Sequence, residues 1–147
     1  MQVILACVDF SDVERRVVDA AMSLARALGG ALHVLHVGEP DPTFVGYASG
    51  PQTVRDQVAS TLREQHRRVE AIASEATRQG LDAHPHTLRG PYVATILDEA
   101  ARLHADVIVI GSHGHGRLHG ILAGSVTSGV LRGAKVPVLV VPHPAQA

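Results

Sequence analysis

A glycine-rich segment that follows an apolar run is the part of this sequence best suited to chemistry. Gly111, Gly114 and Gly124 follow the spacing G-x2-G-x9-G, and Ser125 comes directly after the last of them. The segment begins after the run Val107–Ile110 and ends where a helical pattern starts. Glycines let backbone N–H groups approach an anion closely, and a helix N-terminus adds partial positive charge. The spacing therefore predicts a phosphate cradle, and nucleotide binding is the first hypothesis.

The loop between these glycines contains histidines but no carboxylates. His113, His115 and His119 are imidazoles, which are good zinc ligands, but no Cys, Asp or Glu lies near them in the sequence to complete a site. Phosphoryl transfer usually needs acids that hold a metal and a group that positions water. We therefore expect a nucleotide-binding protein with no resident metal site and with at most slow hydrolysis.

Length and composition predict one domain, residues 1–147, with an aliphatic core. Hydrophobic residues make up 46% of the chain and aromatic residues only 3%. The net charge of −1 favours neither nucleic acid nor an acidic membrane as a partner. Cys7 is the only cysteine, and the N-terminus lacks the pattern of a signal peptide. No apolar run approaches the ~20 residues of a membrane span, so we expect a cytoplasmic protein.

Five short apolar runs alternate with amphipathic stretches. The expected strands are Val3–Val8, Ala31–Val37, Leu81–Leu88, Asp106–Ile110 and Val136–Val141. The expected helices begin at the capping-box pattern Ser11–Glu14, near Pro51, at Pro91 and at Ser125. This alternation predicts an α/β fold, a doubly wound five-stranded parallel sheet with helices on both faces.

The expected strand order is 3-2-1-4-5, because the third strand is the least apolar and suits an edge. In that order the chain reverses between strands 1 and 4, and the loops after these two strands form the crevice where ligands usually bind. Asp9 follows strand 1, and Gly111 follows strand 4. The fold and the glycine motif therefore indicate the same place.

The chain resembles the universal stress protein family over essentially its whole length. The residues that carry the resemblance are Val8–Ser11, Leu35–Val37, Gly111–Gly116, Gly124–Thr127 and Val136–Pro142. The pattern G-x2-G-x9-G-[S/T] marks the ATP-binding branch of that family and is complete here. The resemblance implies a regulatory or stress-response protein that binds ATP, with Mg²⁺ assisting.

By motif position, the resemblance also implies a role for each site residue. Asp9 would hydrogen-bond the ribose or the adenine edge, and Val37 would hold the adenine, partly through its backbone. The phosphates would be lined by Gly111, Gly114, Gly124 and Ser125, with N–H groups from Val126 and Thr127. The flanking residues Val8, Phe10, Ile110 and His113 complete the expected site. From the residues alone, Asp9 could instead be a turn or helix-cap residue, although Ser11 is the better cap, and Ser125 could be the N-cap of the last helix.

The last strand, Val136–Val141, is too apolar to remain a bare sheet edge. Universal stress proteins, which this chain resembles, dimerise through that strand, so we expect a homodimer. Two other functions stay open: an ATPase or a phosphoryl or nucleotidyl transferase, and a ligand-free dimer that acts like a chaperone.

Overall fold

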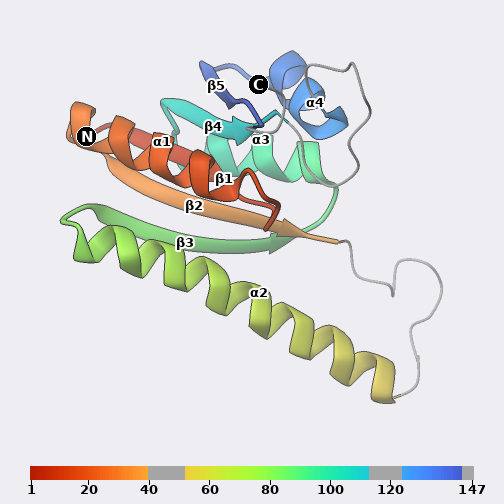
Figure 1. The fold of residues 1–147 in the computed structure, drawn as a ribbon. Coiled ribbons are helices and arrows are strands. Elements are labelled where there is room, and N and C mark those ends of the chain that lie inside the picture. Colours follow the sequence, from red (N-terminus) through yellow and green to blue (C-terminus); the bar gives the residue numbers. More distant parts are fainter. Residues whose placement is uncertain (40–51, 113–123, 144–147) are drawn as a thin grey trace.

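The five strands form one parallel sheet in the predicted order, β3-β2-β1-β4-β5 (Figure 1). This computed structural model describes residues 1–39, 52–112 and 124–143. The strands are β1 (Val3–Cys7), β2 (Ala31–Gly38), β3 (Asp82–Arg89), β4 (Val107–Gly111) and β5 (Val138–Val141). The helices are α1 (Glu14–Leu28), α2 (Gln52–Arg78), α3 (Tyr92–Arg102) and α4 (Ser125–Gly133).

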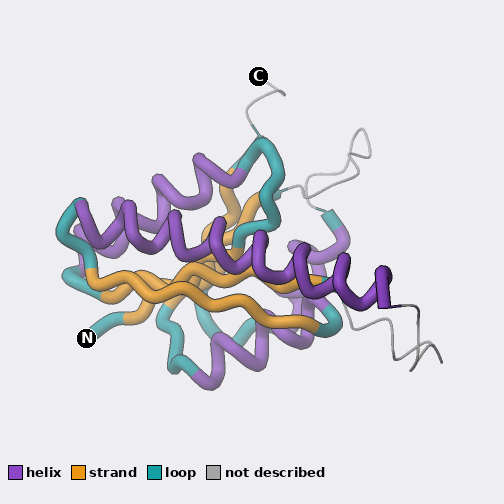
Figure 2. Tube along the Cα trace, turned by 90° about the horizontal axis from the view of Figure 1, so that it is seen from below, coloured by secondary structure: helices purple, strands orange, loops and turns teal. Residues whose placement is uncertain are grey.

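Alternate residues of each strand face opposite sides of the sheet, which separates two apolar cores. Ile4 and Ala6 of β1 lie in the core beneath α1 and α2, together with Leu32 of β2. Leu5 of β1 and Ile108 of β4 lie in the core beneath α3 and α4. Figure 2 shows helices on both sides of the sheet. The central strands are therefore buried on both faces, which explains their continuous apolar sequences.

One edge strand contains a proline, and the other begins directly after one. Pro85 lies within β3, which pairs only with β2 and so has one side that needs no ladder N–H groups. The predicted start of the last strand at Val136 is wrong, because β5 begins at Val138. Pro137 has no N–H to donate, although its carbonyl accepts a hydrogen bond from Ile108 N–H at 3.0 Å.

The start of α1 also differs from the prediction. Val13 occupies the N-cap position without a capping side chain, and the buried hydroxyl of Ser11 has no hydrogen-bond partner among the described residues. Phe10 has a left-handed backbone with φ of 61°. Because this tight turn comes between β1 and the helix, Ser11 lies too early to cap it, and the predicted capping box is wrong.

Helix α2 is longer than the strand it covers. It has 27 residues, whereas β3 has 8, and its first turns extend beyond the sheet (Figure 1). Val54 near its start is 46% exposed, whereas Val69 is fully buried. The C-terminal half of α2 therefore supplies most of its contact with the sheet. None of the described helices combines the length and apolar character needed to cross a membrane.

Two glycines bring α4 close to α3. A Cβ atom at Gly129 would lie 2.6 Å from Val93 Cγ2, and one at Gly133 would lie 2.5 Å from Leu97 Cδ1. Both distances are shorter than Cβ contacts in proteins, so larger residues would push α4 away from α3. The glycines therefore help to set the position of α4, whose N-terminus follows the glycine-rich loop.

Candidate functional site

The ends of three neighbouring strands bring the predicted site residues together. β1 pairs with β2 on one side and β4 on the other, with Ala6 opposite both Val34 and Val109. Val8 N–H donates to the Leu35 carbonyl at 2.9 Å, so the pairing with β2 continues past the end of β1. Asp9 therefore emerges between the ends of β2 and β4, at the predicted switch point.

The glycine-rich loop leaves and re-enters the fold at adjacent backbone groups. Gly124 N–H donates to the Ser112 carbonyl at 2.7 Å, and the Thr127 hydroxyl donates to the Gly111 carbonyl at 2.7 Å. These bonds fix the start of α4 against the end of β4. Residues 113–123 lie outside the described residues, and with them His113, Gly114 and the histidines considered for zinc.

The N-terminus of α4 has the properties of an anion-binding site. Gly124 is the N-cap in an extended conformation, no side chain among the described residues caps the helix, and its first turn has no acidic residue. The first helical bond runs from Ser128 N–H to the Gly124 carbonyl at 2.9 Å. The N–H groups of residues 125–127 precede that bond and are not used within the helix. They and the helix dipole favour a bound anion.

This geometry also decides one alternative from the sequence. Ser125 is the first residue of α4 and not its N-cap, so the capping role considered for it is wrong. Its side chain is exposed at the helix N-terminus. A hydroxyl at that position is free to meet the same anion as the backbone N–H groups.

Asp9 acts as a turn residue, and this role leaves part of its carboxylate available. Its Oδ1 accepts a hydrogen bond from Ser11 N–H at 3.0 Å, which is the turn geometry that Asp side chains favour. That is its one hydrogen bond within the described part of the chain. Oδ2 can therefore accept a ligand hydroxyl while Oδ1 keeps the turn.

Two apolar residues of the predicted site, Val37 and Ile110, are available only through their backbones. Val37 and Ile110 are 7% and 6% exposed, and both side chains lie in the core beneath α3 and α4. Val126 packs against the same core. The part of the prediction that assigns Val37 a backbone role is therefore compatible with its burial, whereas its side chain is committed to packing.

Sequence reasoning missed a connection between the loop and the C-terminal segment. Ser112 N–H donates to the Val141 carbonyl at 2.8 Å, and the Ser112 hydroxyl accepts from His143 N–H at 3.1 Å. The buried ring of His143 places Nε2 2.6 Å from Asp12 Oδ2. The partners are separated by up to 131 positions, and no local pattern predicts such a contact.

A second polar cluster lies away from this site, beneath α3. His33 Nδ1 on β2 is 2.8 Å from His86 Nε2 on β3, and the His33 ring stacks on His84 with centroids 4.8 Å apart. His86 Nδ1 is 3.3 Å from the buried carboxylate of Glu99, which also accepts from Arg102 Nε at 2.8 Å. This cluster, His33–His84–His86–Glu99, joins the edge strand to α3.

Metal and thiol chemistry find no support among the described side chains. No three His, Cys, Asp or Glu residues in the described ranges are grouped so that they could hold a metal ion. Burial raises the pKa of the Cys7 thiol to about 12, so the thiol is protonated at neutral pH and is a poor nucleophile.

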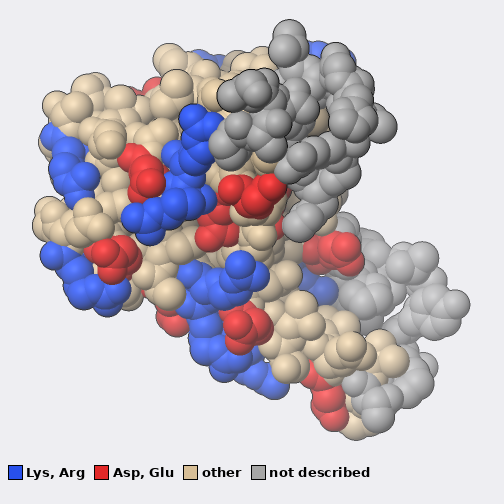
Figure 3. Space-filling view, in the orientation of Figure 1, with Lys and Arg blue, Asp and Glu red and all other residues tan. Residues whose placement is uncertain are grey.

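The face formed by α1 and α2 carries both signs of charge (Figure 3). Its exposed ion pairs are Arg15–Asp19, Arg67–Glu64 and Arg78–Glu75. Such exposed pairs contribute little stability, and each cation has its counter-charge beside it. These pairs therefore make no one-signed field on this face.

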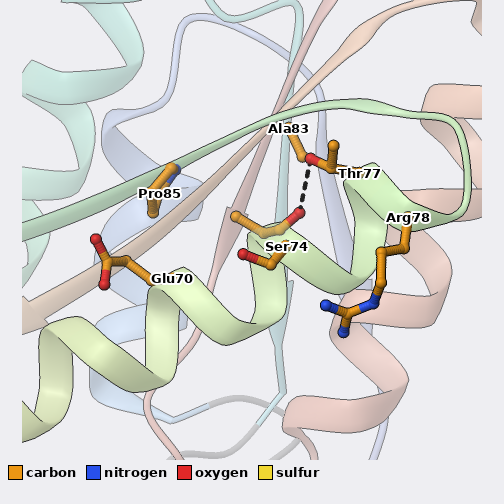
Figure 4. A pocket seen from close by; sticks show the side chains of 7 residues that line it. Glu70, Ser74, Thr77, Arg78, Ala83 and Pro85 are labelled. Carbon is orange, nitrogen blue, oxygen red and sulfur yellow. Dashed lines mark hydrogen bonds between the residues drawn. The ribbon is translucent and has the colours of Figure 1, made fainter.

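An open groove on the surface lies far from the switch point. Figure 4 shows its lining residues, Glu70, Ala73, Ser74, Thr77, Arg78, Ala83 and Pro85. The Thr77 hydroxyl donates to the Ala73 carbonyl at 3.0 Å, so this polar group is already satisfied. The groove runs between the end of α2 and the start of β3, at the opposite end of the sheet from Asp9. It is not part of the candidate site.

Comparisons with known proteins agree with this geometry. Residues 1–142 match the model of the universal stress protein family. Universal stress protein A homolog 1 of Coxiella burnetii is 34% identical over 147 residues, which cover 94% of each chain. The solved structure of hypothetical protein MJ0577 has a TM-score of 0.80 at 25% identity and covers 97% of this chain and 96% of its own. A universal stress protein solved in complex with cAMP has a TM-score of 0.65 at 26% identity, with 96% of each chain covered.

Proposed function

Because this chain belongs to the universal stress protein family, we propose that it binds adenine nucleotides, with ATP as its main ligand. The observation that carries the proposal is the uncapped N-terminus of α4, which opens beside the end of β4 at the switch point. The cAMP complex of a structural neighbour supports an adenine nucleotide as the class of ligand.

The proposed ligand lies with its phosphates at α4 and its nucleoside toward β1 and β2. Gly111, Gly124 and Ser125 lie at the phosphate end, where the free N–H groups of α4 gather. Asp9 accepts a hydroxyl of the ribose or the adenine edge through Oδ2, and the backbone at Val37 contacts the adenine. Mg²⁺ would accompany a triphosphate and offset its charge.

We propose a regulatory role in stress response, and at most slow hydrolysis. The first turn of α4 has no acidic residue that could hold a metal for phosphoryl transfer. The Asp9 carboxylate already accepts a hydrogen bond within the turn. This suits a group that holds a ligand in place better than one that transfers a proton. We also propose that the protein acts in the cytoplasm, since its lone cysteine fits a reducing compartment.

The proposed assembly is a homodimer that pairs two copies of β5. β5 is at the edge of the sheet, and Leu139 on it is 41% exposed. An apolar edge invites strand pairing, and a closed two-fold dimer covers both edges at once.

The first test is whether the protein carries and binds adenine nucleotide. Mass spectrometry of natively purified protein should detect bound adenine nucleotide, and calorimetry should give the order of affinity for ATP, ADP, AMP and cAMP. Gly114→Val should abolish ATP binding because a branched side chain would fill the phosphate space, whereas Gly120→Val, outside the motif spacing, should retain it. ATP affinity unchanged by Gly114→Val would refute the phosphate cradle. Rapid ATP turnover would favour the alternative that the protein is an ATPase or a transferase.

The second test separates the two roles of Asp9. Asp9→Asn keeps an oxygen for the Ser11 N–H but replaces the other acceptor by an amide donor. It should weaken ATP, ADP and AMP by a similar factor, on the order of 1–3 kcal/mol, with no loss of thermal stability. Asp9→Ala should weaken binding and also destabilise the turn. A loss confined to triphosphates would place Asp9 on the metal instead of the nucleoside.

A further inference from the structure

The residue after Asp9 has an unfavourable backbone conformation. Phe10 has φ of 61°, and this left-handed region is uncommon for a bulky residue. Residues in such conformations persist only when their surroundings hold them there. The contacts of Phe10 therefore show what fixes the turn that presents Asp9.

Three side chains from different elements form a stack on the α1 and α2 side of the sheet. The Phe10 ring lies on the imidazole of His36 from β2, with centroids 4.2 Å apart and planes inclined by 27°. The guanidinium carbon of Arg68 from α2 lies 4.0 Å from the centroid of the Phe10 ring. A cation this close to an aromatic face is attracted by the ring quadrupole. The stack Arg68–Phe10–His36 thus connects α2 to the end of β1.

The imidazole at the base of the stack holds the backbone immediately before Asp9. His36 Nδ1 is 3.0 Å from the Val8 carbonyl, which can only accept, so Nδ1 carries the proton. His36 is 6% exposed, and its Nε2 has no hydrogen-bond partner in the described part of the chain. Burial lowers the pKa of His36, which keeps the ring neutral at neutral pH. The neutral ring thus serves to hold the Val8 carbonyl and to support Phe10.

The charge of Arg68 also acts on Glu14, the first residue of α1. The pKa of Glu14 is raised by burial, lowered by the charge of Arg68 and raised by Asp9. Asp9 Oδ1 accepts a hydrogen bond from Ser11 N–H. Asp9 is thereby held through the carbonyl before it, which bonds His36, and through its own bond to the Ser11 N–H after it.

We propose that Arg68, Phe10 and His36 are positioning residues that hold Asp9 in place for the nucleoside end of the ligand, so that α2 contributes to nucleotide affinity through the stack. The inference rests on the proposed function, since it concerns the same site. None of the three residues needs to touch the ligand to affect its affinity.

The test is a double-mutant cycle in the full-length protein, with ATP affinity measured by calorimetry. Arg68→Ala should weaken ATP about threefold to tenfold, the range expected from losing one cation–π contact. In an Asp9→Ala background the same change should have no further effect, because Arg68 acts through Asp9. Arg67→Ala is the matched control: Arg67 is exposed on the same helix, pairs with Glu64 at 2.7 Å, and should leave affinity unchanged.

Two substitutions of Phe10 separate the stack from the backbone. Phe10→Tyr keeps the ring and should keep ATP affinity. Phe10→Gly relieves the left-handed conformation but removes the ring, and should weaken ATP as Arg68→Ala does. In Phe10→Gly the pKa of His36, followed by NMR, should rise toward its ordinary value because the ring no longer covers it.

The outcomes distinguish the two hypotheses. If the unmodified protein does not bind adenine nucleotide, the proposed function and the positioning role both fail, while the His36 titration still reports whether the stack forms. The positioning role alone is overturned if the unmodified protein and Arg68→Ala bind ATP equally tightly. It is also overturned if the effects of Arg68→Ala and Asp9→Ala on the free energy of ATP binding are additive.

Discussion

The cluster His33–His84–His86–Glu99 predicts that mild acid destabilises the fold, and that His33 makes a separable contribution. The pKa of His33 is lowered to about 4, first by burial and then by the neighbouring His86 and His84, against the opposing charges of Asp82 and Glu99. In the unfolded chain this histidine has its ordinary pKa of 6.5. The unfolded state therefore binds a proton at His33 more readily, and stability falls as the pH decreases from about 6.5 to about 4.

The magnitude follows from the two pKa values of His33. At about pH 5 the unfolded histidine is almost fully protonated and the folded one is not, which corresponds to about 2 kcal/mol relative to neutral pH. Because the His33 ring is only partly buried, water screens part of this energy, and we expect about 1 kcal/mol. The pKa of Glu99 is lowered, first by its hydrogen bond to Arg102, so this carboxylate stays ionised through the window and contributes at lower pH.

The assay is urea unfolding followed by circular dichroism, at fixed protein concentration, from about pH 7.5 to about pH 4.5. His33→Gln removes the titrating group and keeps a donor for His86. Its unfolding free energy should fall by about 1 kcal/mol less than that of the unmodified protein over this range. His104→Asn, which replaces an exposed histidine outside this cluster by a residue that tolerates its left-handed backbone, should show the same fall as the unmodified protein. Parallel curves for His33→Gln and the unmodified protein would refute the reasoning.

Three further predictions follow from packing. Gly129→Ala should lower the unfolding free energy by about 1–3 kcal/mol in chemical denaturation, because its Cβ would meet Val93 at 2.6 Å. Adding Val93→Ala should recover part of this loss. Equal losses in the single and double variants would contradict the contact. Thr127→Val removes the hydroxyl donated to the Gly111 carbonyl and should cost about 1 kcal/mol of thermal stability and weaken ATP in calorimetry; unchanged values of both would exclude that role. Val138→Lys with Val140→Lys should give monomers or aggregates in light scattering, and a monomeric unmodified protein would contradict the β5 dimer.

The sheet was predictable because its information is local. Runs such as Val107–Ile110 are buried on both faces and therefore read as continuous apolar segments, and the weak third strand gave the edge and hence the order. The glycine spacing likewise predicted that Gly124 lies at the N-terminus of α4. These features depend on neighbouring residues and on packing rules shared by parallel sheets.

The details of the turn after β1 were not predictable in the same way. Ser11 and Glu14 have the spacing of a capping box, but the left-handed conformation of Phe10 shifts the start of α1 to Glu14. The Phe10 ring contacts Arg68 and His36, which approach only after α2 and β2 have packed. A local pattern was therefore overridden by tertiary contacts, and these contacts lie beside the candidate site.

The hydrogen bonds of Ser112 have a consequence for how concentration affects the protein. Its N–H joins the end of β5, and its carbonyl joins the start of α4. One residue thus belongs to both the edge proposed to pair two copies and the loop proposed to hold phosphate. If dimerisation raises the affinity for nucleotide by some factor, nucleotide must strengthen dimerisation by the same factor. Dilution would then release nucleotide, and nucleotide would set the dilution at which the two copies separate.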